Sequence, residues 1–182
     1  MQVVIVYESM YGNTHLVAGA IEAGFAPGAD VTVVPVSAAR PELLDEAALV
    51  VVGGPTHVHG MSRAATRKGA AEAAQKPDSG LTLEPDALSP GLREWFGTLG
   101  QCHTKAAAFD TRIKAPAALT GRASKGIARE LRQHSFEMAA EPESFFVTKE
   151  NHLEASEEDR AREWGAQLAA EIFRQPGPGA TL

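Results

Sequence analysis

Three short runs of almost uninterrupted aliphatic residues constrain the fold of this chain more than any other feature. They occupy residues 3–7, 31–36 and 49–52 and consist largely of valine. A strand with one face in water alternates apolar and polar residues, whereas a strand covered by helices on both faces is apolar throughout. These runs therefore predict a parallel β-sheet with helices on both faces.

The segments between the runs have the spacing of amphipathic helices. Apolar residues recur every three or four positions in the first of them, at Leu16, Val17, Ala20, Ile21 and Phe25. Further apolar runs at residues 106–109 and 145–148 predict a fourth and a fifth strand. Helices are predicted over residues 122–134 and after Ser156, whose hydroxyl would cap the last helix.

Strand and helix alternate to about residue 174, which predicts one α/β domain over residues 1–174. We expect three layers around a doubly wound sheet of five parallel strands in the order 2-1-3-4-5. A length of 182 residues, of which 44% are hydrophobic and 22% charged, suits a single domain. Residues 77–90, with three prolines and a glycine, predict an inserted surface loop, and residues 175–182 predict a disordered tail.

Charge and cysteine content exclude several classes of function. A formal charge of -6 disfavours nucleic acid as a partner, because binding its phosphates needs a surplus of basic residues. Cys102 is the single cysteine, which rules out an intramolecular disulfide and predicts a packing role near the start of the fourth strand. No apolar run is long enough for a signal peptide or a membrane span. We therefore expect a cytoplasmic protein that folds from Met1 and has no integral membrane contact.

The loop after the first predicted strand concentrates hydrogen-bond donors. Residues 8–14 have the sequence Glu-Ser-Met-Tyr-Gly-Asn-Thr, with hydroxyls at Ser9 and Thr14 and an amide at Asn13. Ligands of open parallel sheets bind beyond the carboxyl ends of the strands, and the N-terminus of a helix attracts anions. The loop therefore predicts a site for an anion such as a phosphate.

Other phosphate-binding loops do not match. The chain lacks the Gly-x-x-x-x-Gly-Lys-Ser/Thr sequence of ATP and GTP P-loops and the Gly-x-Gly-x-x-Gly turn of NAD-binding domains. A phosphatase of this topology would place a nucleophilic cysteine in the loop, whereas Cys102 is distant in sequence. A receiver domain would have an aspartate after the third strand, where this chain has Gly53-Gly54. A polar turn that only caps the helix remains the alternative.

The pattern Ser9-x-Tyr11-Gly12-Asn13-Thr14 resembles the phosphate loop of the flavodoxin family. That family has Thr/Ser-x-Thr-x-Gly-x-Thr or the shorter Ser-x-Tyr/Thr-Gly-Asn-Thr, so Tyr11 stands where many members have threonine. The resemblance implies FMN as the cofactor. Its phosphate would be held by Ser9, Met10, Tyr11, Gly12, Asn13 and Thr14.

Two later segments resemble the other flavin-contacting loops of the family. Residues 53–60 have the sequence Gly-Gly-Pro-Thr-His-Val-His-Gly, and residues 109–112 match the third loop by position after the fourth strand. By this resemblance the flavin ring would be contacted by Pro55, Thr56, His57, Val58, His59, Gly60, Phe109, Asp110, Thr111 and Arg112. His57 and His59 lack a third convergent ligand, so no metal site is predicted.

The surroundings expected for the flavin differ from those of many flavodoxins. The second and third loops offer no Trp or Tyr to stack on the ring, and the basic residues near them are His57, His59, Arg63, Arg67 and Arg112. Positive charge favours the reduced, more negative flavin, so we expect a less negative potential for full reduction than in a low-potential flavodoxin.

The resemblance implies an electron-transfer protein that passes electrons between redox partner proteins and needs no catalytic side chain. An FMN-dependent oxidoreductase that acts on a quinone-like or protoporphyrinogen-like small molecule is the alternative. The partners implied are redox partner proteins or a small-molecule electron acceptor. A scaffold that has kept the fold without the cofactor is a second alternative. The oligomeric state stays open.

Overall fold

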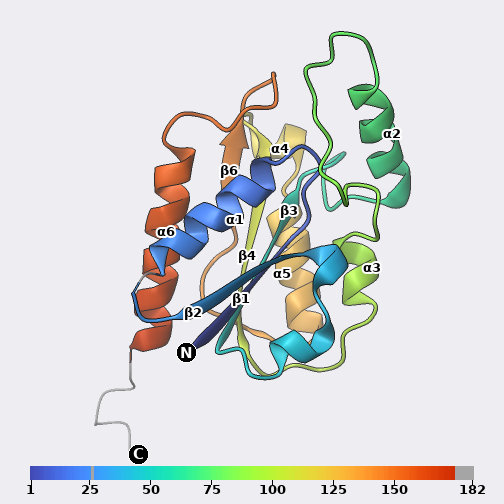
Figure 1. The fold of residues 1–182 in the computed structure, drawn as a ribbon. Coiled ribbons are helices and arrows are strands. Elements are labelled where there is room, and N and C mark those ends of the chain that lie inside the picture. Colours follow the sequence, from blue (N-terminus) through green and yellow to red (C-terminus); the bar gives the residue numbers. More distant parts are fainter. Residues whose placement is uncertain (26, 175–182) are drawn as a thin grey trace, which may run out of the picture.

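A parallel β-sheet forms the centre of the protein, whose computed structural model describes residues 1–25 and 27–174 (Figure 1). Its strands are β1 (Gln2–Tyr7), β2 (Asp30–Pro35), β3 (Leu49–Pro55), β4 (Lys105–Ile113), β5 (Glu137–Met138) and β6 (Glu143–Val147). They lie in the order β2-β1-β3-β4-β5, with β6 also paired to β4, and all pairs are parallel. The predicted order 2-1-3-4-5 is confirmed.

The last position of the sheet is occupied by two strands, where one was predicted at residues 145–148. β5 pairs with the beginning of β4, at Lys105 and Ala106, and β6 pairs with residues 109–113 of the same strand. Pro142 stands directly before β6 and has no N–H to donate to a neighbouring strand. The ladder is therefore interrupted between the two strands.

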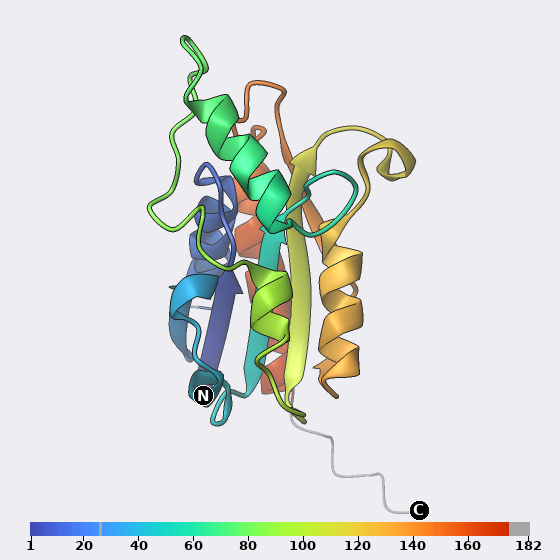
Figure 2. The same cartoon turned by 90° about the vertical axis from the view of Figure 1, so that its right-hand side faces the viewer.

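Helices cover both faces of the sheet. α1 (Asn13–Gly24) and α6 (Glu157–Phe173) lie side by side on one face, and α3 (Leu92–Phe96) and α5 (Ala123–Gln133) lie on the other (Figures 1 and 2). α2 (Ala64–Ala74) and α4 (Ala117–Thr120) lie beyond the carboxyl ends of the strands (Figure 2). Two short 3-10 helices, at Val36–Ala38 and Pro41–Leu44, follow β2.

A hydrophobic core fills the space on each face of the sheet. Alternate residues of β1 divide between the two cores, with Val3 and Ile5 facing α1 and α6 and Val4 and Val6 facing the other side. All four are almost fully buried. The expectation that the first strands are covered on both faces is confirmed for β1 and β3. It is wrong for β2, which lies at the edge of the sheet and has no buried residue.

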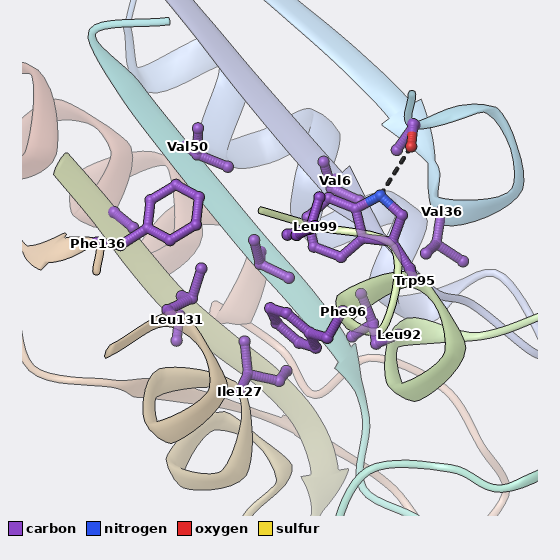
Figure 3. Packing of buried hydrophobic residues seen from close by; sticks show 14 of the residues in the cluster. Val6, Val36, Val50, Leu92, Trp95, Phe96, Leu99, Ile127, Leu131 and Phe136 are labelled. Atoms are coloured by element: carbon purple, nitrogen blue, oxygen red, sulfur yellow. Dashed lines mark hydrogen bonds between the residues drawn. The ribbon is translucent and has the colours of Figure 1, made fainter. Parts of the chain in front are cut away.

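The core under α3 and α5 contains a buried tryptophan that also makes a hydrogen bond (Figure 3). Leu92, Trp95 and Phe96 of α3 pack toward Ile127 and Leu131 of α5. The indole N–H of Trp95 donates a 2.7 Å hydrogen bond to the carbonyl of Ala39, so the buried ring leaves no N–H unpaired. Cys102 lies in the loop before β4 and packs against this core, as predicted.

Three local predictions need comment. Residues 77–90 form an irregular loop between α2 and α3, as expected, although the sequence set no bounds for these two helices. α6 begins after Ser156, yet Ser156 has a positive φ of 70° and its hydroxyl caps nothing, so the predicted cap is wrong. The acidic first turn of α6 stabilises that end instead, through Glu157, Glu158 and Asp159. The predicted disordered tail at 175–182 lies outside the described residues.

Candidate functional site

The loop between β1 and α1 leaves the N-terminus of α1 without a side-chain cap. Gly12 is the cap residue, and its φ of 93° lies in the left-handed region that glycine adopts without strain. Its own N–H donates to Ser9 Oγ at 3.0 Å, which closes the loop into a turn. The first N–H groups of an α-helix have no partner inside the helix. They are therefore available to an acceptor from outside α1.

Side chains of the same loop connect it to β4 and to the segment that follows β6. The Thr14 hydroxyl shares a 2.8 Å hydrogen bond with the hydroxyl of Thr111 in β4. The Asn13 amide donates to the carbonyl oxygen of Asn151 at 2.9 Å and to its side-chain oxygen at 3.2 Å. The β6–α6 connection, which carries Asn151, is thereby held against the loop.

The outer side of the loop is held by α2 and by the segment that follows it. The Tyr11 hydroxyl donates to the carbonyl of Ala70 in α2 at 2.7 Å. The carbonyl of Met10 accepts the N–H of Glu84 at 2.9 Å. Tyr11, which departs from the threonine of many flavodoxins, thus has a structural role, because its phenol reaches a helix that threonine could not.

A cavity of about 220 Å³ opens between this loop, the end of β3 and the end of β4. It is lined by Ser9, Met10, Tyr11, Asn13, Thr14, Pro55, Thr56, His57, Thr111, Arg112, Ile113, Val147 and Asn151. The three segments singled out in the sequence therefore meet at one place. Ile113, Val147 and Asn151 were not predicted, since only the position of β6 beside β4 brings the last two of them to the cavity.

A second hollow of about 250 Å³ adjoins the first. Thr56, Arg112 and Ile113 line both of them. The rest of the second hollow is lined by Val58, His59, Leu119 and Thr120. Val58 and Leu119 are 80% and 69% exposed, so a mainly apolar rim faces solvent beside the polar cavity.

The loop after β3 has an unusual backbone. Val58 and His59 have φ values of 44° and 70°, and a positive φ is strained for a β-branched residue such as valine. His57 and Gly60 exchange two backbone hydrogen bonds of 2.8 and 3.1 Å, which close the loop. His59 also lies against Gly121, where a β-carbon would be 2.2 Å from the His59 carbonyl oxygen. The two loops that flank the second hollow are therefore in close contact.

The third predicted segment does not form a loop. Residues 109–112 lie inside β4, which continues to Ile113, so the predicted end of the fourth strand at residue 109 is wrong. Thr111 and Arg112 still reach the cavity. Phe109 is fully buried and packs edge-on against Phe145 and Trp164 in the core under α1 and α6, away from the cavity.

Asp110 has a structural partner at the start of α5. Its Oδ2 accepts the N–H of Ser124 at 2.8 Å and the hydroxyl of Thr56 at 3.1 Å, and it is fully buried. The Thr56 oxygen in turn accepts the N–H of Ala123 at 2.9 Å. Asp110 and Thr56 together cap α5 and fix the position of the second loop.

Positive charge at the cavity is smaller than the sequence indicated. Arg67 is buried, donates to Ser62 Oγ at 2.9 Å and pairs with Glu94 at 3.1 Å, and Ser62 in turn donates to buried Glu8. Its charge is compensated there, and it does not line the cavity. Burial lowers the pKa of His57, which favours its neutral form.

Arg112 is the one permanently charged side chain that lines the cavity within the described part of the chain. Its guanidinium donates to the carbonyl of Ala115 at 2.7 Å and to the Thr120 hydroxyl at 3.0 Å, and lies 4.8 Å from the ring centre of Phe146.

Residues 1–25 and 27–174 include no group of three His, Cys, Asp or Glu side chains placed to hold a metal ion. Nor does any helix in these ranges combine the length and apolarity needed to cross a membrane.

Comparison with known proteins places this arrangement in a family. The family model described as flavodoxin matches residues 5–97, about half of the chain and the part that holds the first two loops. A search of curated protein sequences found no match.

Solved structures resemble the chain over nearly its whole length. A flavodoxin from the domain Archaea is 19% identical, with a TM-score of 0.64 over 96% of this chain and 100% of its own. Oxidised flavodoxin 1 from Bacillus cereus is 17% identical, with a TM-score of 0.65 over 93% and 98%. The WrbA-like flavodoxin from Agrobacterium tumefaciens is 20% identical, with a TM-score of 0.56 over 94% and 96%. These structures share the fold, and with the family match they show that the chain belongs to the flavodoxin family.

Proposed function

We propose that this protein binds FMN at the carboxyl ends of β1, β3 and β4 and transfers electrons through it. The observation that carries this proposal is the uncapped N-terminus of α1, which lies beside the 220 Å³ cavity. A phosphate group satisfies unpaired N–H groups and the positive end of the helix dipole without any lysine. The Asn13 amide already donates to Asn151, and the Thr14 hydroxyl is bonded to that of Thr111. Ser9 Oγ only accepts the Gly12 N–H, so the backbone N–H groups and the Ser9 O–H are the main donors for the phosphate.

We assign the flavin ring to the second hollow because the polar and apolar parts of the ring match the residues that line it. An isoalloxazine ring is flat and largely apolar with a polar edge, and this hollow combines Val58, Ile113 and Leu119 with Thr56 and Arg112. The two hollows share three lining residues, so one molecule with a phosphate at one end and a ring at the other can occupy both. When bound, FMN supplies the electron-carrying chemistry, and the protein positions it.

The exposed rim of the second hollow is suited to an electron donor or acceptor. Val58 and Leu119 expose apolar surface where the ring would lie, and exposed apolar groups beside a cofactor provide contact area for a redox partner protein or a small-molecule acceptor. Burial lowers the pKa of His57 and so favours its neutral form, and we assign no side chain a role in proton transfer. We therefore favour an electron carrier over an FMN-dependent oxidoreductase that acts on a quinone-like or protoporphyrinogen-like molecule.

Titration of the purified protein with FMN tests this proposal. We expect the fluorescence of FMN to be quenched and its visible absorption to shift on binding at one site per chain. Replacing Gly12 by Asp adds a negative charge at the loop, and we expect it to weaken FMN binding by at least about tenfold. Gly12→Asn has nearly the same shape and the same positive φ without the charge, and serves as the control for strain in the loop. Gly19→Asp adds the same charge further along the helix, where no atom lies within 4 Å of the new β-carbon.

A protein that binds no FMN would leave the cofactor-free scaffold as the better account. FMN binding of unchanged affinity in Gly12→Asp would contradict the placing of the phosphate at the start of α1. Addition of NAD(P)H and a quinone to the FMN-loaded protein then separates the two flavin functions. Rapid turnover without a separate reductase would favour the oxidoreductase. Slow turnover that a reductase accelerates would favour the electron carrier.

A further inference from the structure

The segment between α2 and α3 brings a carboxylate to the outer side of the phosphate loop. Glu84 reaches the loop through its backbone, whose N–H donates to the Met10 carbonyl at 2.9 Å. Its Oε1 lies 3.2 Å from His15 Nδ1 and 3.5 Å from the place where a β-carbon on Gly12 would be. The Glu84 side chain is only 18% exposed. The backbone contact therefore holds this carboxylate close to the first turn of α1, although it does not line the cavity.

The negative charge of Glu84 also acts on two side chains near the start of α1, Tyr7 and His15. Burial, together with smaller contributions from the negative charges of Glu84 and Asp86, raises the pKa of Tyr7 to about 12. The Tyr7 ring stacks on the ring of His15 at 4.5 Å, so Glu84 acts on both groups at the end of β1 and the start of α1. The first turn of α1 contains no acidic residue of its own. Glu84 is thus a negative charge supplied to that helix end by a distant segment.

We propose that Glu84 sets the discrimination of this site between a phosphorylated and an unphosphorylated flavin, an inference that rests on the function proposed above. Both the Glu84 carboxylate and the phosphate of FMN are attracted by the N-terminus of α1, and each repels the other. Riboflavin has the same ring and ribityl chain as FMN but carries no charge. Glu84 therefore weakens FMN binding and leaves riboflavin binding unaffected. The affinity of the site for FMN relative to riboflavin is then lower than it would be without this charge.

The substitution Glu84→Gln isolates this charge. Glutamine has the same shape, keeps an oxygen that can accept from His15, and leaves the backbone hydrogen bond to Met10 in place. Kd values for FMN and for riboflavin are measured by fluorescence quenching in low salt near pH 8, where free imidazole groups are neutral. We expect the Kd for FMN to fall by about three- to tenfold and the Kd for riboflavin to stay within about twofold.

Asp86→Asn is the matched control. Asp86 lies on the same segment, two residues further along, and its carboxylate accepts a 2.8 Å hydrogen bond from Ser37. Asp86→Asn removes the same unit of charge as Glu84→Gln. A smaller change in the Kd for FMN in Asp86→Asn than in Glu84→Gln therefore supports a local action of Glu84. A further supporting result is that added salt reduces the difference between wild type and Glu84→Gln, because screening acts on charge alone.

Two outcomes would overturn the inference while leaving the proposed function intact. One is an equal Kd for FMN in wild type and Glu84→Gln. The other is a shift of the same size for FMN and riboflavin, which would mean that Glu84 shapes the loop and does not act through its charge. Failure of wild type and both variants to bind either flavin would instead refute the proposed function itself.

Discussion

At the scale of single residues, the polar groups around the cavity divide into those that bind other parts of the protein and those left for a ligand. Ser9, Asn13 and Thr14 use their side chains to hold the loop. Arg67 is paired with Glu94 under α2. The groups that remain are the backbone N–H donors at the start of α1 and the O–H of Ser9. Arg112 adds positive charge to the cavity, although its guanidinium already donates to Ala115 and Thr120. The site is therefore built to bind an anion mainly through its backbone.

This distribution of charge bears on the reduction potential. Arg67 is compensated, and burial favours neutral His57, so Arg112 carries most of the positive charge that would face a reduced flavin. The expectation of a less negative potential for full reduction stays a prediction, now resting chiefly on Arg112. Potentiometric titration of the FMN-loaded protein checks it against Arg112→Gln, which we expect to have a more negative potential.

His57 gives stability a dependence on pH. Burial lowers its pKa in the folded protein, an effect that Glu8 partly opposes and Arg67 reinforces. An unfolded histidine takes up a proton below about pH 6.5, whereas folded His57 does so only at lower pH. The unfolded state therefore gains protons first, and the folded state loses stability as the pH falls through this window.

We expect His57→Gln to lose less stability than wild type between about pH 7.5 and about pH 5, by up to about 1 kcal/mol. Urea denaturation at the two pH values measures the difference. His59→Gln, at an exposed position in the same loop, is the control. An identical loss of stability in wild type and His57→Gln would show that His57 titrates alike in both states.

At the scale of the elements, β4 does more than contribute a central strand. Its last residues remain in the sheet through Ile113, and Asp110 uses the buried position to cap α5. The same carboxylate accepts from Thr56, which fixes the loop after β3. One strand thus positions a helix and two of the segments that line the cavity.

Asp110→Ala removes this cap and leaves buried donors on Ser124 and Thr56 without their acceptor. We expect a loss of about 2–4 kcal/mol in the free energy of unfolding, measured by chemical denaturation. Asp159→Ala is the comparison, since the Asp159 side chain is 73% exposed in its ion pair with Arg162 and should cost less than about 1 kcal/mol. Equal effects of the two substitutions would contradict the role given to Asp110.

At the scale of the whole molecule, the first and last helices, α1 and α6, pack directly against each other. A β-carbon on Gly24 of α1 would lie 2.2 Å from the Arg162 carbonyl oxygen, and one on Gly165 of α6 would lie 2.2 Å from the Ile21 carbonyl oxygen. Glycine at these two positions lets the helix backbones touch. The contact holds α1, and with it the phosphate loop, in place from the other end of the chain.

Gly24→Ala should therefore force the helices apart and lower the free energy of unfolding by about 1–3 kcal/mol. Gly19→Ala lies in the same helix where a β-carbon meets nothing within 4 Å, and we expect it to be neutral or stabilising by up to about 1 kcal/mol. Thermal unfolding of the two variants compares them directly. A stable Gly24→Ala would mean that the helices can shift without loss of packing.

The sequence alone determined the alternation of strands and helices, the order of the sheet and the place of the first loop. The alternation and the first loop follow from local patterns, because valine-rich runs and turn residues act over short distances in the chain. The order of the sheet follows from the general topology of doubly wound sheets. Only the tertiary structure decided which polar residues are buried, including some that the sequence suggests are exposed. Asp110 and Arg67 are buried because distant partners, the N–H of Ser124 and the carboxylate of Glu94, compensate them. Glu84 and Asn151 meet the phosphate loop for the same reason, since only the folded chain brings hydrogen-bond partners so distant in sequence together.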